Sequence, residues 1–196
     1  MNIIKLGGSI VNPNGKYDDK IINEFIKLVG KSKEKFIFVV GGGKITRNSQ
    51  NVSGKFLKEA LKKKDKISRG NDYLGIAVTK INANYVIDKF KQKLEKVVYP
   101  EILIDPTVKI NSKHRIFFAG GWKPGHSTDT DMILFAETFK ANKIFKISDI
   151  AYVKNISPLK LNKLSKINQK KKLNEAENLK QMKWGELKKL VGEKWI

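Results

Sequence analysis

Three glycine-rich turns each follow an apolar, strand-like segment of this sequence. The turns read Gly7-Gly8-Ser9, Gly41-Gly42-Gly43 and Gly120-Gly121-Trp122-Lys123-Pro124-Gly125. Glycine allows the backbone to approach a ligand closely and to point successive N–H groups at it. Because the carboxyl ends of parallel strands share one edge of a sheet, we expect the three turns to line one crevice. A single turn of this kind is more often just a tight turn, whereas three turns at one edge predict phosphate binding.

Cationic side chains stand beside these turns. Lys5 lies at the end of the first strand-like segment, and Lys44 and Arg47 follow the second turn. Phosphoryl transfer needs cations that neutralise the migrating group and hold donor and acceptor in line. Lys5 and Arg47 are therefore candidate catalytic residues. The alternative is that such residues are solvated cations in a lysine-rich chain.

The third turn continues as His126-Ser127-Thr128-Asp129, where a helix is expected to begin. Ser127 or Thr128 would cap that helix, with Asp129 in its first turn. Capping alone can explain these residue types, and the functional alternative is that their hydroxyl and N–H groups hold an acceptor phosphate or sugar. His126 lacks the second histidine and the carboxylate of a metal site, so we interpret it as a loop residue near the ligand.

Apolar strand-like segments alternate with amphipathic helix-like segments, a pattern typical of α/β proteins. Strands are expected at Asn2–Leu6, Lys35–Val40, about Glu101–Ile104, Arg115–Ala119 and Lys143–Ile147. Helices are expected at about Asp18–Val29, from near Lys44, at about Tyr73–Lys96 and at Asp129–Lys140. Strand-to-helix connections of this length imply parallel neighbouring strands.

The remainder of the chain is less regular. Lys154–Lys180 is polar, lysine-rich and weakly periodic, which indicates a long surface excursion, and Trp184–Val191 has the pattern of a short amphipathic helix. A chain of 196 residues is long enough for one domain with its own core, and a second full domain is not expected. We therefore expect a single domain over residues 1–196.

The composition is strongly basic. There are 40 Lys and Arg residues against 19 Asp and Glu, a net charge of +21, and such a surface attracts phosphate-bearing partners from nucleotides to RNA. Only three of the 40 are arginine, and the interleaving of arginine with aromatic residues that is typical of nucleic-acid readers does not appear. Solvated lysine faces are therefore favoured over a nucleic-acid site.

Cysteine is absent, which excludes disulfides, thiolate metal sites and a cysteine nucleophile. No apolar run approaches the ~20 residues of a membrane-spanning helix, and the first residues do not have the layout of a signal peptide. We expect a soluble, cytoplasmic protein without a membrane partner.

Four stretches of the sequence carry a resemblance to a known family. They are Lys5–Ser9, Val40–Arg47, Asp72–Ile76 with Asn82-Ala83, and Gly120–Asp129. On these residues the sequence resembles the amino acid kinase family and, within it, the archaeal-type uridylate (UMP) kinases, from Ile3 to about Trp195. The last stretch is the most discriminating, because acetylglutamate, aspartate and carbamate kinases lack such a loop. Isopentenyl phosphate kinases place a catalytic histidine shortly after the second turn, and Lys44–Gln50 contains none.

The resemblance implies a three-layer αβα sandwich with a mainly parallel central sheet, and transfer of the ATP γ-phosphate to UMP with Mg²⁺ accompanying the ATP. It implies that ATP is bound by Gly8, Ser9, Gly43, Arg47, Ser148 and Asp149. It implies that UMP is held by Gly42, Asp72, Trp122, Lys123, Pro124, Gly125, His126, Ser127, Thr128 and Asp129. Because the relatives assemble as hexamers built from dimers, a homo-oligomer is expected.

The chain departs from the family pattern in two ways. It carries Ala151 and Ser157 where relatives have acidic residues and Lys154 where they have an aromatic residue, which removes carboxylates expected near ATP and its metal. The family also continues past the equivalent of Trp195 with another helix and closing strands, which this chain is expected to lack, as a short form or a fragment. A non-catalytic nucleotide-binding member of the family is therefore the alternative to an active UMP kinase. An RNA-binding module ranks last.

Overall fold

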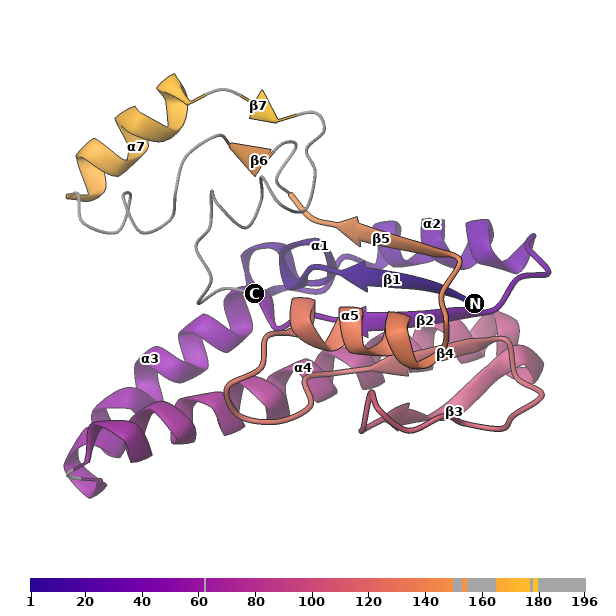
Figure 1. Cartoon of the computed structure of the whole chain (residues 1–196), viewed down its shortest axis with the longest axis horizontal. Helices are drawn as coiled ribbons and strands as arrows, with labels where there is room; N and C mark the ends of the chain where they lie inside the picture. The colour runs from indigo at the N-terminus through magenta and orange to yellow at the C-terminus, as the bar shows by residue number, and fades with distance from the viewer. Residues whose placement is uncertain (62, 150–152, 155–164, 177, 180–196) are drawn as a thin grey trace. The chain divides into compact units, whose positions relative to one another are not determined.

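Five parallel strands form the sheet of the first unit of the chain in this computed structural model (Figure 1). The structure describes residues 1–61, 63–149, 153–154, 165–176 and 178–179. The strands are β1 (Asn2–Leu6), β2 (Phe36–Val40), β3 (Val98–Leu103), β4 (Ile116–Ala119) and β5 (Lys143–Ile147), in the order β3-β4-β2-β1-β5. Every neighbouring pair is parallel, so the carboxyl ends of all five strands lie at the same edge.

Helices connect the strands of this first unit, which spans Met1–Asp149. They are α1 (Gly8–Val11), α2 (Asp19–Gly30), α3 (Gly43–Ala60), α4 (Lys64–Leu94) and α5 (Thr128–Thr138), with short 3₁₀ segments η1 (Pro13–Gly15) and η2 (Glu95–Val97). The α2 helix begins after Asp18, whose carboxylate accepts the N–H groups of Lys20 and Ile21 at 3.0 and 3.1 Å. Such a cap satisfies donors that the first helical turn leaves unpaired. The short α1 helix was not expected, because the sequence indicated only a turn at its first residues.

Alternating residues of the strands point to opposite faces of the sheet, and each face is covered by helices. One face packs against α2 and α4, through a cluster that includes Ile4, Leu6, Phe38, Ile22, Ile26, Val86 and Phe90. The other face packs against α5, through a cluster that includes Ile3, Ile37, Val39, Phe117, Met132 and Phe135. The predicted three-layer αβα sandwich with a parallel central sheet is therefore confirmed (Figure 1).

Two elements extend further than the sequence indicated. The α4 helix begins nine residues before the expected Tyr73 and runs through Gly70, a residue that weakens helices. Gly70 faces α3, and a Cβ there would lie 3.2 Å from the Leu57 side chain, so a larger residue would force Leu57 to move. The β3 strand begins at Val98 rather than Glu101, and it tolerates Pro100 because it lies at the edge of the sheet.

The second unit, Ile150–Ile196, is described only in part. The short strands β6 (Val153–Lys154) and β7 (Asn178–Leu179) pair antiparallel, and the α7 helix (Lys166–Glu175) follows the capping residue Ser165. The interpretation of Lys154–Lys180 as a surface excursion did not predict α7, because a helix that is polar on all sides leaves no apolar periodicity. The helix expected at Trp184–Val191 lies outside the described residues, and the single domain over residues 1–196 stays a prediction.

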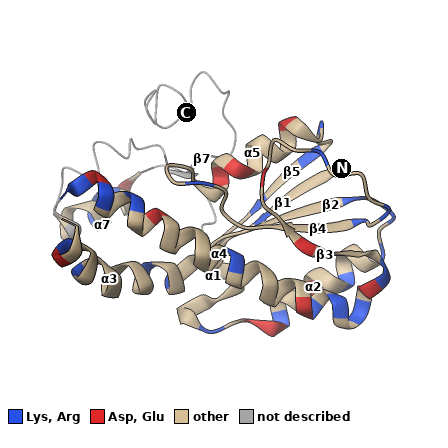
Figure 2. Ribbon diagram, turned by 90° about the horizontal axis from the view of Figure 1, so that it is seen from below, with Lys and Arg blue, Asp and Glu red and all other residues tan. Residues whose placement is uncertain are grey.

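Charged residues of both signs are found on many elements of the structure. Within the described ranges, none of the helices combines the length and the apolar composition needed to cross a bilayer. Figure 2 shows Lys and Arg spread over several helices and strand ends, with Asp and Glu among them.

The buried aromatic cluster gives a test of the fold. Phe38 on β2 is fully buried, with ring centroids 5.4 Å from Phe90 and 5.2 Å from Phe118. Phe38→Ala should lower the free energy of unfolding by about 3–5 kcal/mol, because it leaves a cavity in the core. Phe56→Ala on α3 is the matched control, since Phe56 is 67% exposed, and should change this free energy by less than about 0.5 kcal/mol. Urea unfolding measures both, and equal losses would contradict the packing described.

Candidate active site

The first and second glycine turns meet backbone to backbone at the carboxyl edge of the sheet. The Gly7 N–H donates to the Ile147 carbonyl, and the Gly41 N–H donates to the Leu6 carbonyl, both at 2.9 Å. A Cβ on Gly8 would lie 2.0 Å from the Gly43 nitrogen, and Gly43 itself has φ +66°. Only glycine fits at both positions. These contacts place the turns after β1 and β2 side by side, as the sequence predicted.

Asn82 on α4 anchors the second turn. It is fully buried, and its Nδ2 donates to the carbonyls of Gly41 at 2.9 Å and Gly42 at 3.1 Å. Its Oδ1 accepts a hydrogen bond from the Tyr17 hydroxyl at 3.0 Å. A buried amide with its partners in place is rigid, because any movement would leave polar groups unpaired. The conformation of the second turn therefore depends on α4.

The third turn is fastened to α4 as well. The Gly121 N–H donates to the Thr79 hydroxyl at 2.7 Å, and the Gly125 N–H donates to Asp72 Oδ2 at 2.9 Å. At the end of the loop Ser127 Oγ accepts the Thr130 N–H at 3.1 Å, so Ser127 is the cap of α5. The structure therefore confirms the prediction that all three turns lie at one edge of the sheet.

A cavity of about 300 Å³ opens between these elements. Its walls come from the second turn with α3, from the first half of α4, and from the third turn with the start of α5. The lining residues are Gly42, Gly43, Thr46, Arg47, Gln50, Asp72, Gly75, Ile76, Thr79, Gly121, His126, Ser127 and Thr128. Arg47 forms no ion pair with any residue that the structure describes, which leaves its charge available to an anion in the cavity.

Two lysines and a carboxylate meet at the same edge. Lys5 on β1 and Lys146 on β5 are opposite each other in the sheet, and both contact Asp129 Oδ1, at 3.0 and 3.2 Å. Like charges directly opposite in a sheet repel, and the carboxylate between them offsets this repulsion. Burial by itself would raise the pKa of Asp129, but the two ammonium groups outweigh it and hold the pKa below its usual value. The result is a pair of cations held together by one carboxylate in the first turn of α5.

The predicted ATP-binding residues divide into two neighbouring groups. Gly43 and Arg47 line the cavity. Ser9 Oγ donates to Asp149 Oδ1 at 2.8 Å, so these two residues, 140 positions apart, are in contact. The Ser148 backbone lies against Gly7, where a Cβ would approach the Ser148 Cα to 3.6 Å.

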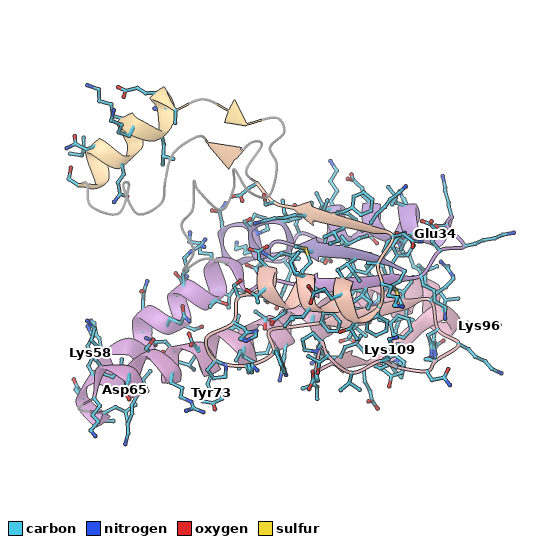
Figure 3. The ribbon with its side chains drawn as sticks, viewed as in Figure 1. Glu34, Lys58, Asp65, Tyr73, Lys96 and Lys109 are labelled. Carbon is cyan, nitrogen blue, oxygen red and sulfur yellow. The ribbon has the colours of Figure 1, made fainter. Side chains whose placement is uncertain are left out.

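The predicted UMP-binding residues do not all line one cavity. Five of them line the cavity described above, namely Gly42, Asp72, His126, Ser127 and Thr128. Asp72 also lines a second cavity of about 620 Å³, together with Lys123, Pro124 and Gly125 from the third turn and Asp65, Ser68, Arg69 and Tyr73 from α4. Figure 3 shows Asp65 and Tyr73 on the first half of this helix. Trp122 and Asp129 line neither cavity.

Sequence reasoning missed two residues of this site. Lys146 was overlooked, although it occupies the same next-to-last position in its strand as Lys5 does in β1, and that correspondence was visible in the sequence. Asp131 was overlooked because a carboxylate in the first turn of a helix is ordinarily a surface residue. In the structure it is fully buried, and its Oδ2 accepts the Trp122 N–H at 3.1 Å.

The structure is that of an α/β protein in which three glycine turns and several cations gather at one edge of a parallel sheet. The model of the Amino acid kinase family matches residues 1–186, and the chain belongs to this family. It is 30% identical over 154 residues to a uridylate kinase of Pyrococcus abyssi (strain GE5 / Orsay), covering 76% of this chain and 62% of that protein. It is 28% identical over 152 residues to a uridylate kinase of Archaeoglobus fulgidus, with the same coverage of both.

Solved structures show the same fold. A uridylate kinase from Archaeoglobus fulgidus superposes with a TM-score of 0.63 at 24% identity, over 83% of this chain and 77% of that one. A UMP kinase from Bacillus anthracis superposes with a TM-score of 0.57 at 16% identity, over 86% and 77%. The chain spans about 62% of the length of the curated relatives that it matches.

The carboxylate between the lysines gives a test that depends on pH. The Asp129 carboxyl should titrate below its usual value, and Lys146→Gln should raise its pKa because one of the two cations is lost. Since the pKa is lower in the folded chain than in the unfolded chain, the stabilisation by this group is complete above the unfolded pKa and is lost as pH falls through the folded pKa. Carboxyl NMR titration measures the shift, with the exposed Lys143→Gln on the same strand as control. An Asp129 pKa that both variants leave unchanged would contradict the cluster.

Proposed function

We propose that this protein transfers the γ-phosphate of ATP to UMP and so produces UDP, a step of pyrimidine nucleotide biosynthesis. The observation that carries the proposal is the cavity at the carboxyl edge of the sheet, which Arg47 lines together with the second and third glycine turns, while Gly8 of the first turn packs on Gly43. The sequence relatives named uridylate kinase support the choice of nucleotide.

In this proposal UMP occupies the cavity. Its phosphate lies near Gly42 and Arg47, and its nucleoside lies toward Asp72 and the loop Trp122–Asp129. Asp72 already accepts the Gly125 N–H, so the same carboxylate would both shape the loop and face the nucleoside. Thr46 and Gln50, on the same face of α3 as Arg47, complete the wall opposite the loop.

ATP is assigned to the neighbouring turn. Gly8 and Ser9 would contact its phosphates together with Gly43 and Arg47, and Ser148 and Asp149 would face its base and ribose. The Ser9 hydroxyl and the Asp149 carboxylate already lie 2.8 Å apart, which supports one ligand bridging both. Since Gly8 packs directly on Gly43, the two nucleotides would approach each other at this contact.

The cations supply the catalysis in this proposal. The transferred phosphoryl group spreads negative charge over its oxygens, and preorganised cations stabilise it without rearranging during the reaction. Lys5 and Arg47 would stabilise that charge directly. Asp129 would hold Lys5 and Lys146 in place, so that the two ammonium groups remain close together despite their repulsion.

Magnesium would enter with ATP. Among the residues that the structure describes, no three His, Asp or Glu side chains converge as a metal site. Mg²⁺ commonly binds through substrate phosphates and keeps several water ligands, so the donor set here fits a metal held mainly by ATP. When bound, Mg²⁺ neutralises charge on the phosphates.

With the same function we propose a dimer or hexamer of this chain and a cytoplasmic location. Both proposals rest on the family resemblance.

A non-catalytic nucleotide-binding protein is the second candidate. It is favoured by the replacement of two acidic residues of the family by Ala151 and Ser157 and of an aromatic residue by Lys154. In that case UMP binds, but no ADP is released, and restoring aspartate with Ala151→Asp should increase turnover.

A coupled assay tests the function. ADP release should require both UMP and Mg²⁺. Arg47→Ala should lower kcat/KM by roughly 2–4 kcal/mol of transition-state stabilisation, because one cation on the transferring group is lost. Arg115→Ala is the matched control, because Arg115 immediately precedes β4 and its guanidinium donates to the Glu34 carbonyl at 3.0 Å, and it should leave the rate unchanged. No UMP-dependent ADP release at millimolar substrate would refute the proposal.

A further inference from the structure

A buried carboxylate stands behind the one histidine of the cavity. Asp131 on α5 has no exposed surface, and its Oδ1 lies 3.4 Å from Nδ1 of His126. Its other oxygen accepts the Trp122 N–H at 3.1 Å, which fixes the carboxylate against the third turn. The Trp122 ring meets the His126 ring edge-on, with centroids 5.0 Å apart and planes at 87°. The imidazole is therefore held on two sides.

His126 Nδ1 and Asp131 Oδ1 face each other in the interior. His126 Nδ1 and Asp131 Oδ1 are both buried, and neither has a hydrogen-bond partner in the described part of the chain. Buried polar atoms are almost always paired, so a proton on Nδ1 shared with the carboxylate accounts for both. Burial raises the pKa of Asp131, against the opposing effects of the Trp122 N–H and His126, which agrees with a carboxylate that attracts such a proton.

The rest of the His126 ring is not fully buried. The His126 side chain is 25% exposed, and Nε2, unlike Nδ1, is not among the buried polar atoms without a partner. His126 lines the cavity that we assign to UMP. In neutral histidine the hydrogen bond of one ring nitrogen decides which nitrogen carries the proton.

We propose that Asp131 is a positioning residue that keeps the proton of neutral His126 on Nδ1. Nε2 then faces the nucleotide as a hydrogen-bond acceptor when the ring is neutral. When the ring is protonated, Nε2 is a cationic donor. The inference rests on the proposed function in one respect, namely that UMP is the ligand of this cavity. UMP presents acceptor oxygens on its ionised phosphate and its carbonyls, and donors at its ribose hydroxyls and at the uracil N3–H. A protonated Nε2 adds a charge-assisted hydrogen bond to one of the acceptor oxygens, so we expect the cavity to bind UMP more tightly as the pH falls.

Other charged groups surround this pair. Lys123 lies in the same loop, with its ammonium 3.8 Å from the centroid of the Trp122 ring, and it favours the ionised form of Asp131. Asp72 on α4 and Arg47 on α3 line the same cavity as His126. Of these groups, Asp131 is the one in direct contact with Nδ1 of His126. Replacing Asp131 therefore isolates its effect on the His126 tautomer.

The Asp131→Asn variant should move the proton of neutral His126 from Nδ1 to Nε2. The Asn amide can still accept the Trp122 N–H through its oxygen, while its NH₂ group donates to Nδ1 and drives the proton to Nε2. In this variant Nε2 is a donor in both protonation states. UMP affinity should then lose most of its dependence on the ionisation of His126. A mere loss of packing around the ring would not remove this dependence.

Nitrogen-15 NMR of the imidazole rings in the full chain reads the tautomer without any ligand. At alkaline pH the wild-type His126 should carry its proton on Nδ1, and the Asp131→Asn variant should carry it on Nε2. His114, whose Nδ1 contacts Ser112, is the internal control and should be the same in both. A wild-type ring protonated on Nε2 would overturn the proposal even if the variant does not fold.

Calorimetry with UMP then measures the consequence. Between pH 8.5 and 5.5 the wild-type affinity should rise about tenfold relative to that of Asp131→Asn, the change expected for one charge-assisted hydrogen bond. UMP itself titrates near pH 6, but this contribution is the same for every variant and cancels in the ratio. His126→Gln, which cannot titrate, should behave like Asp131→Asn. A ratio that stays constant with pH overturns the proposal. Absence of UMP binding together with the expected tautomers would instead refute the proposed function.

Discussion

The site depends on the direct backbone contact between the turns after β1 and β2. Gly8 and Gly43 approach so closely that no side chain fits between them, and both turns are bonded to the ends of neighbouring strands. The parallel order of β4, β2 and β1 brings the third turn to the same edge. In the proposed function this arrangement binds phosphate, because backbone N–H groups that lie near one point attract anions without any charged side chain.

Charge is added to this surface by residues whose positions the sheet also fixes. Lys5 and Lys146 are opposite each other because β1 and β5 pair in register, and Asp129 reaches both from the first turn of α5. The same helix supplies Asp131 behind His126, so one helical turn supports two different groups of the site. The α4 helix plays the matching part on the other face, where Asn82 and Thr79 hold the second and third turns.

The sequence predicted the strands, the sheet edge and the meeting of the three turns, because these follow from local apolar patterns and from the geometry of parallel sheets. It did not predict the early start of α4, since Gly70 is explained only by its contact with Leu57 on α3. It also could not show that Asp131 is buried or that the loop residues divide between two cavities, because both depend on tertiary packing. The roles of individual residues toward ATP and UMP remain predictions.

The central claim is that the amides of the glycine turns bind phosphate. Backbone ¹H–¹⁵N NMR of the full chain during titration with UMP tests it most directly. Phosphate binding by these amides should give the largest amide shifts at Gly42 and Gly43, which line the cavity, with smaller changes at Gly54 in the middle of α3. Shifts confined to the lysine-rich helix surfaces, with the glycine amides unmoved, would contradict it.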